Sequence, residues 1–304
     1  MDSDCRALCR KWNWIVLCSA GIIAAIVVAG NYRANFYGLF GNVRGKGFIV
    51  HDNERITKYL FSYNYIPTNF DGLLIGSSIS ENWDTKLIRN FRVYNASLRG
   101  ANISEEALIA DNVLTRSRPR IWIVLIFPAL TLTHGRRSGY MNPQEYWGAL
   151  GSIQLFRAYG NKWLTSLRHA NEEFNDFGCK DYQEPSLRLE LKEVSEFVID
   201  SRSLKEYSDL LQRARSQGVR IVGVIPPIEM ERSKLERQAF ESYNAKVRTF
   251  FLADEPIIDL NDPALESLRM QKDNFPNGYH LSKAAADQVV RVIDARLKGL
   301  NARD

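Results

Sequence analysis

Three short segments bring serine, glycine and histidine to the ends of predicted strands or the start of a predicted helix. The first is 76–80 (GSSIS), which directly follows an apolar run at 72–75. A serine at a strand-to-helix turn exposes its hydroxyl, and the adjacent backbone N–H groups point towards whatever binds there. Serine is also common as a plain helix cap, so this turn by itself supports both interpretations.

The other two segments complete a possible catalytic group. In 95–102 (NASLRGAN), Gly100 can bring a backbone N–H close to a ligand, although a turn glycine before a helix explains it equally well. In 277–282 (NGYHLS), His280 can take a proton from a serine on a neighbouring loop. The ordinary alternative for His280 is a surface residue near a helix start. The remaining histidines have no comparable placement: His51, His134 and His169.

Short apolar runs that alternate with amphipathic stretches must position these segments. Such alternation is typical of βαβ units, and it predicts a doubly wound, mostly parallel five-stranded α/β sheet of the flavodoxin-like kind. Ligands of such sheets bind beyond the carboxyl ends of the strands. The predicted strands are 72–75, 92–95, 121–127, 219–224 and 257–260.

Capping signals and apolar stripes predict the helices. Asn102 with Glu105 and Ser203 with Glu206 have the spacing of capping boxes. A long charged helix is expected at 229–252, and a last helix from about Ser282 has its apolar residues on one stripe. Residues 131–200 have many aromatic residues and no clear period, so we expect an insertion of irregular helices there.

Together, the three segments resemble the SGNH, or GDSL-like, hydrolase family over about 71–300, the insertion excepted. LLIGSSIS is similar to that family's serine block, NASLRGAN to its glycine block and NGYHLS to its histidine block. The resemblance implies Ser78 as nucleophile, His280 as base, and the N–H groups of Ser78 and Gly100 as oxyanion donors. The GSS wording and an N-terminal anchor look closest to membrane-anchored members, which include the D-alanyl-lipoteichoic acid transfer protein and the alginate O-acetyltransferases.

Two departures separate this sequence from the family pattern. The family has Asp three residues before the histidine, where this chain has Asn277. Asparagine can hold the imidazole by a hydrogen bond but cannot stabilise the imidazolium by charge, a loss that cost about 10⁴ in rate in a comparable triad. Asp273 substitutes for it if the loop folds back. The family's Asn block after the third strand is also missing, because the residues there are 127–130 (FPAL).

The N-terminal segment predicts attachment to a membrane. Residues 12–30 contain no charge and are long enough to cross about 30 Å of hydrocarbon, with Arg10 and Lys11 just before them. We expect a single-pass anchor in the cell (inner) membrane, with the main domain on the periplasmic or extracellular side. A cleaved signal peptide is the alternative. The expected organisation is a cytosolic stub and anchor at 1–30, a juxtamembrane stalk at 31–70 and the α/β domain at 71–300.

Composition excludes other classes. The net charge of +5 comes from scattered residues without a basic stripe, so nucleic-acid binding is not expected. Cys5 and Cys9 have no further Cys or His at ligand spacing, and we expect neither a metal site nor a cofactor. Cys179 is the lone cysteine of the outer domain, so no internal disulfide is expected there.

Two functions remain open. The first is acyl-ester hydrolysis or O-acyl transfer on a cell-envelope or exported polysaccharide, with an acylated carrier as donor and a membrane acyltransferase as a potential partner. The second is a non-catalytic relative that binds a glycan or a partner at the membrane. In that case the insertion's rings form either a sugar-stacking groove or core: Tyr140, Tyr146, Trp147, Phe156, Tyr159 and Trp163. A nucleotide-binding domain is disfavoured, because no glycine-rich phosphate loop follows a strand.

Overall fold

The computed structural model describes residues 3–35, 37–40, 54–133, 141–157, 160, 174–180 and 192–301, and its centre is a five-stranded parallel sheet. The strand order is β2-β1-β3-β4-β5, and every neighbouring pair is parallel. This confirms the predicted doubly wound α/β class. The strands are β1 Gly72–Ile75, β2 Val93–Asn95, β3 Ile121–Leu125, β4 Arg220–Ile225 and β5 Ile257–Asp259.

The strands form where the apolar runs predict them, because both faces of the sheet are covered. All residues of β1, β2 and β3 are buried, which explains why β1 and β3 are apolar without alternation. The strand order reverses at β1, since the chain first adds β2 on one side and then β3, β4 and β5 on the other. Right-handed connections therefore lie on opposite faces of the sheet on the two sides of this reversal.

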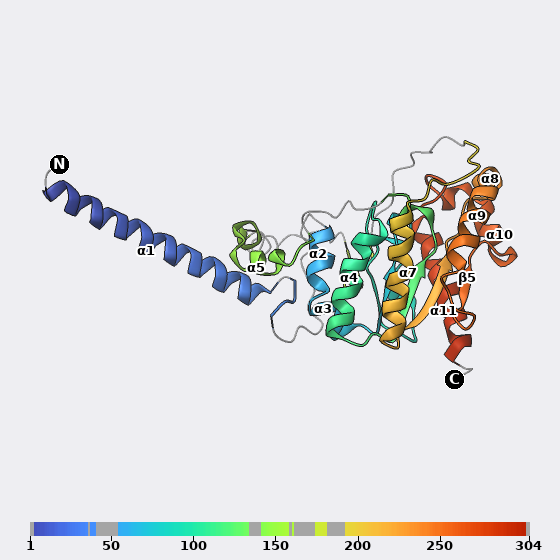
Figure 1. The fold of residues 1–304 in the computed structure, drawn as a ribbon, viewed down its shortest axis with the longest axis horizontal. Coiled ribbons are helices and arrows are strands. Elements are labelled where there is room, and N and C mark those ends of the chain that lie inside the picture. The colour runs from blue at the N-terminus through green and yellow to red at the C-terminus, as the bar shows by residue number, and fades with distance from the viewer. Residues whose placement is uncertain are drawn as a thin grey trace.

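Helices cover the sheet accordingly (Figure 1). Helix α4 (Ile103–Arg116) packs beside α7 (Ser201–Ser216) on one face. Helix α11 (Lys283–Asn301) packs with the short helix η2 (Thr85–Leu87), which belongs to the β1–β2 connection. Other short helices of the domain include η1 Ser78–Ser80, η3 Pro128–Leu130, η4 Pro263–Leu265, α10 Glu266–Met270 and η5 Lys272–Asn274.

One predicted capping box is present and the other is wrong. At the start of α4, the Asn102 side chain accepts from the N–H of Glu105, and the Glu105 carboxylate accepts from the N–H of Asn102. At α7 the cap is Asp200, whose carboxylate accepts from the N–H of Ser203 at 2.8 Å. The Ser203 hydroxyl donates to the Thr133 carbonyl, because a tertiary partner is within reach.

The single helix predicted at 229–252 is two helices. Helix α8 (Met230–Leu235) ends at Glu236, and α9 (Arg237–Arg248) begins directly after it. Glu236 is buried and its carboxylate binds Arg232 and the Tyr279 hydroxyl. Residue 236 lies outside helical geometry, at φ −109° and ψ 12°.

The packed body begins before the predicted boundary at residue 71. Helices α2 (Glu54–Phe61) and α3 (Tyr65–Asn69) lie within the segment predicted as a stalk. Their side chains Leu60, Phe61 and Ile66 are buried in the same core as the strands. Residues 54–70 are therefore part of the α/β body.

The N-terminal helix α1 (Ser3–Ala34) projects away from the body (Figure 1). Its stretch Leu8–Ala34 has a mean hydropathy of 2.1 and is long and apolar enough to span a membrane. Most of its apolar side chains are exposed, as in the case of Trp14 and Ile22. At its C-terminal end α1 packs against α5 (Gln144–Gly151), a helix of the predicted insertion.

Candidate active site

The serine turn follows β1 and is packed closely against the loop after β2. Gly76 ends the strand, and a Cβ there would overlap the Ser80 and Ser97 hydroxyl oxygens. The Oγ atoms of Ser80 and Ser97 are 2.8 Å apart and hydrogen-bonded, and both residues are fully buried. Ser78 begins η1 and is only half-buried. The predicted nucleophile is therefore the partly accessible member of a turn whose other serines are buried.

Asn95 fixes this turn from the end of β2, a role that sequence reasoning missed. Its side-chain amide is fully buried and donates to the carbonyls of Ser80 at 2.8 Å and Trp83 at 3.0 Å. Its side-chain oxygen accepts from the N–H of Ser97 at 3.0 Å. A buried amide with this many partners organises both loops at once. No residue spacing indicates it, because the carbonyls it binds belong to a different loop.

Gly100 lies on the second loop in the conformation that the sequence suggested. Its φ is +61°, in the left-handed region that glycine adopts without strain. It is exposed, and a Cβ there would meet no atom within 4 Å. The backbone conformation, and not lack of space, thus favours glycine at this position. That its N–H serves as an oxyanion donor stays a prediction.

His280 is held by Asn277 on the loop before α11. The Asn277 side-chain oxygen accepts from the N–H groups of Tyr279 and His280, at 3.2 and 3.0 Å. The same oxygen lies 3.0 Å from His280 Nδ1, and the Asn277 Nδ2 atom lies 2.7 Å from it. When the oxygen accepts from Nδ1–H, Nε2 keeps the lone pair that a general base needs. Asn277 therefore occupies the orienting position, whereas Asp273 is exposed on η5.

A hydrogen bond joins the serine turn to the histidine loop. Asn82, four residues after Ser78, donates from its side-chain amide to the carbonyl of Leu281 at 2.7 Å. Leu281 directly follows His280 in the sequence. Segments some two hundred residues apart thus lie side by side at the carboxyl edge of the sheet. The structure brings Ser78, His280 and Asn277 to one region, and their catalytic roles stay predictions.

The end of the third strand presents an aromatic ring where the family pattern has asparagine. The Phe127 ring lies 5.7 Å from the Tyr279 ring, centroid to centroid, and 5.9 Å from the Phe240 ring. The Tyr279 hydroxyl donates to Glu236, and the Arg232 guanidinium stacks over the same ring at 4.5 Å. This apolar and ionic packing holds Tyr279, and with it the histidine loop, against the end of β3 and the α8–α9 segment.

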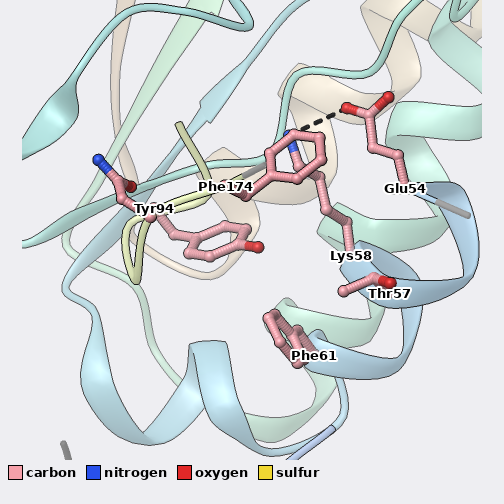
Figure 2. A pocket seen from close by; sticks show the side chains of 7 residues that line it. Glu54, Thr57, Lys58, Phe61, Tyr94 and Phe174 are labelled. Carbon is pink, nitrogen blue, oxygen red and sulfur yellow. Dashed lines mark ion pairs between the residues drawn. The ribbon is translucent and has the colours of Figure 1, made fainter. Parts of the chain in front are cut away.

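A buried charge cluster lies behind the serine turn, and it too was missed by sequence reasoning. The Lys58 ammonium donates to the Ser97 carbonyl at 2.6 Å. It also pairs with Glu54 at 3.2 Å (Figure 2). Lys180 pairs with Glu81 at 3.3 Å. The cluster's members lie on separate segments, so no spacing pattern reveals it. Lys58 contacts the loop after β2 through Ser97, and Lys180 contacts the segment after β1 through Glu81.

Burial sets the protonation of this cluster. Removal from water raises the pKa of Glu81 to about 7; nearby Glu54 acts in the same direction, while Lys58 and Lys180 oppose it. Burial also raises the pKa of the fully buried Glu106 well above its usual value. The small pocket beside these groups is lined by Thr57, Phe61, Tyr94 and Phe174 together with Glu54, Lys58 and Asn175 (Figure 2).

Some of the other predicted residues lie outside the described part of the chain, and others lie within it. His51, His134 and His169 lie outside the described residues, as do Tyr140, Tyr159 and Trp163. Tyr146, Trp147 and Phe156 lie near the end of α1. Within the described residues, no group of three or more His, Cys, Asp or Glu side chains is arranged to hold a metal ion.

Comparisons with known proteins add a distant structural likeness. No protein-family model matches the sequence, and no curated protein matches it. Among solved structures, the crystal structure of the lipase/acylhydrolase from Enterococcus faecalis is similar. The match covers 75% of this chain and 95% of the acylhydrolase chain. The two are 13% identical with a TM-score of 0.38, too distant for the likeness to support any statement about the site.

Proposed function

We propose that this protein is a membrane-anchored serine esterase or O-acyltransferase of the SGNH type. The observation that supports it most is the hydrogen bond from Asn82 to the Leu281 carbonyl, which holds the Ser78 turn against the His280 loop. The contact between Asn277 and His280 Nδ1 adds the orienting partner that a catalytic histidine needs. Nucleophile, base and orienter thus come from the two segments that the sequence pattern names.

The proposed reaction is a two-step acyl transfer. His280 Nε2 removes the proton of the Ser78 hydroxyl as its oxygen attacks an ester carbonyl, and the N–H groups of Ser78 and Gly100 stabilise the oxyanion. Protonated His280 then gives the proton to the leaving alcohol, and an acyl-enzyme forms on Ser78. In the second step His280 takes a proton from water or a sugar hydroxyl as its oxygen attacks the acyl carbon, and it then returns the proton to the Ser78 oxygen as the bond between that oxygen and the acyl group breaks.

The proposed substrates follow from the anchor and from the resemblance to anchored SGNH proteins. With Leu8–Ala34 in the cell membrane, the α/β body lies at the membrane surface, on the periplasmic or extracellular side in this proposal. There it would act on a cell-envelope or exported polysaccharide, with an acylated carrier as donor and a membrane acyltransferase as partner.

Specific features also favour a non-catalytic relative that binds a glycan or a partner. Asn277 supplies no charge to stabilise an imidazolium, and Phe127 presents an apolar ring where an amide donor would be expected. A binding protein needs neither group. Such a protein would keep the fold and the joined loops without turning over an ester.

The test uses the full-length protein in detergent with a short-chain nitrophenyl ester. Ser78→Ala should lower kcat/KM by about 10³-fold or more, because no other group replaces the nucleophile. Ser77→Ala is the matched control: its Oγ is buried and has no hydrogen-bond partner within the described part of the chain, so activity should persist. Unchanged activity in Ser78→Ala would exclude the mechanism, and a wild type that binds polysaccharide without hydrolysis would favour the binding relative.

A further inference from the structure

The end of helix α1 is bonded to α5 and to the turn that follows it. The Asn31 side-chain amide donates to the carbonyls of Leu150 at 2.8 Å and Ser152 at 3.0 Å. Asn31 is buried, and a Cβ at Gly30 would overlap the Phe156 ring. Glycine therefore allows that ring to lie directly against the helix. Figure 1 shows α5 beside the C-terminal part of α1.

These contacts place α5 at a definite depth relative to a membrane that α1 crosses. The uncharged run 12–30 contains nineteen residues, which span about 28 Å of helix, close to the thickness of a bilayer's hydrocarbon core. Gly30 and Asn31 then lie at the boundary between the acyl chains and the headgroups. Because α5 packs on these two residues, it lies at the same level.

The surface at this level is apolar and exposed. We call it the collar, and it consists of Tyr32, Phe40, Tyr146, Trp147 and Ile153. Trp147 is 70% exposed, Tyr32 61% and Ile153 55%. Four of the rings form a continuous series, with centroid distances of 5.3 Å for Tyr32–Phe40, 6.0 Å for Phe40–Tyr146 and 5.1 Å for Tyr146–Trp147.

We propose that the collar inserts into the headgroup region of the bilayer next to the exit of α1. Tryptophan and tyrosine side chains, with an apolar body and a polar tip, favour that region. A soluble protein partner would have to enter the headgroup layer to cover the collar, because the collar is bonded to the last residues of the span. The contact fixes the height and tilt of the α/β body above the membrane. This inference rests on the anchoring that the proposed function includes, and not on catalysis.

The experiment uses the full-length protein in lipid nanodiscs, with Cys5, Cys9 and Cys18 replaced by serine. Trp147→Cys and Ile153→Cys each receive an environment-sensitive fluorophore, and the lipids contain a nitroxide near the headgroup. We expect both labels to show blue-shifted emission, and we expect the nitroxide to quench most of their fluorescence. Met270→Cys is the matched control, since Met270 is 64% exposed on α10 at the far side of the body, and its label should stay unquenched.

A label on Ile22→Cys, in the middle of the span and 62% exposed, separates the collar from the anchor. Quenching at residue 22 by a deep nitroxide, together with water-exposed and unquenched labels at 147 and 153, would overturn the collar and leave the anchor intact. Labels at 147 and 153 that are shielded from water yet unquenched by lipid would also overturn it, because a protein surface would then cover them. Without quenching at residue 22, the anchor and the collar both fail, whatever the esterase activity.

Discussion

Asn277→Asp restores to the histidine loop the charge that the family pattern has there. The side-chain oxygen of residue 277 lies 3.0 Å from His280 Nδ1 and already accepts two backbone N–H groups, which suit a carboxylate as well as an amide. At about 4 Å between charge centres and an effective dielectric constant of 20, the attraction to an imidazolium is about 4 kcal/mol. Residue 277 is buried, so the cost of removing the new charge from water offsets part of this.

A net gain of about 1–3 kcal/mol remains, which corresponds to a rise in kcat/KM of about 10–100-fold. The same attraction should move the acidic limb of the pH–rate profile upward by about one to two units, because the base is more readily protonated. Steady-state hydrolysis of a nitrophenyl ester over a range of pH measures both effects. Asn274→Asp is the matched control, since it adds the same charge where the amide contacts the Leu268 carbonyl instead. An Asn277→Asp protein with unchanged rate and unshifted limb would refute the role of residue 277 as the partner of a catalytic histidine.

Two further variants test the loops and the buried cluster. Gly278 has φ +89°, and a Cβ there would overlap the Arg232 guanidinium. Gly278→Ala should therefore lower the free energy of unfolding by about 1–2 kcal/mol or more and reduce activity. Urea unfolding and ester assays measure the two effects. Burial raises the pKa of Glu106, so the folded state holds that proton more tightly and stability falls as the pH rises above about 4.5. Glu106→Gln should therefore flatten the fall in stability as the pH rises above about 4.5, while Glu241→Gln on the surface keeps the wild-type slope; an equal fall in both variants would contradict this.

The sheet could be predicted from the sequence because local patterns determine it. The longer strands β3 and β4, like β1, are mainly apolar runs that are almost wholly buried, and the structure places all five strands within one or two residues of the prediction. The capping box at Asn102 and Glu105 could be predicted for the same reason, since both partners are three residues apart on one turn of helix.

Features that depend on distant partners could not be predicted. Ser203 has the spacing of a cap but donates to Thr133 instead, and the buried Glu236, where the predicted helix is interrupted, binds Arg232 and the distant Tyr279. The glycine-rich stretch before α2 and α3 favours a stalk. Their burial against the sheet depends on tertiary packing, which no local pattern indicates.

For the candidate site, the sequence indicates the candidate reactive groups and Asn277, but it gives no sign of the other amides that hold the loops. Ser78, Gly100 and His280 could be selected because each follows a strand or precedes a helix in a familiar order. Asn95 and Asn82 bind backbone carbonyls of other segments, at 2.8 and 2.7 Å, and nothing in their neighbourhood in the sequence indicates this. Such roles can be recognised only from the three-dimensional arrangement of the loops.

Reaction with a serine-directed phosphonate tests most directly whether Ser78 and His280 form one site. Applied to the full-length protein, with mass spectrometry of the products, it should add one phosphonyl group to Ser78. It should add none in Ser78→Ala, and in His280→Ala the reaction should be slower by at least about a hundredfold, because the hydroxyl then lacks its general base. Modification of His280→Ala at the wild-type rate, or no modification of Ser78 in the wild type, would contradict the account.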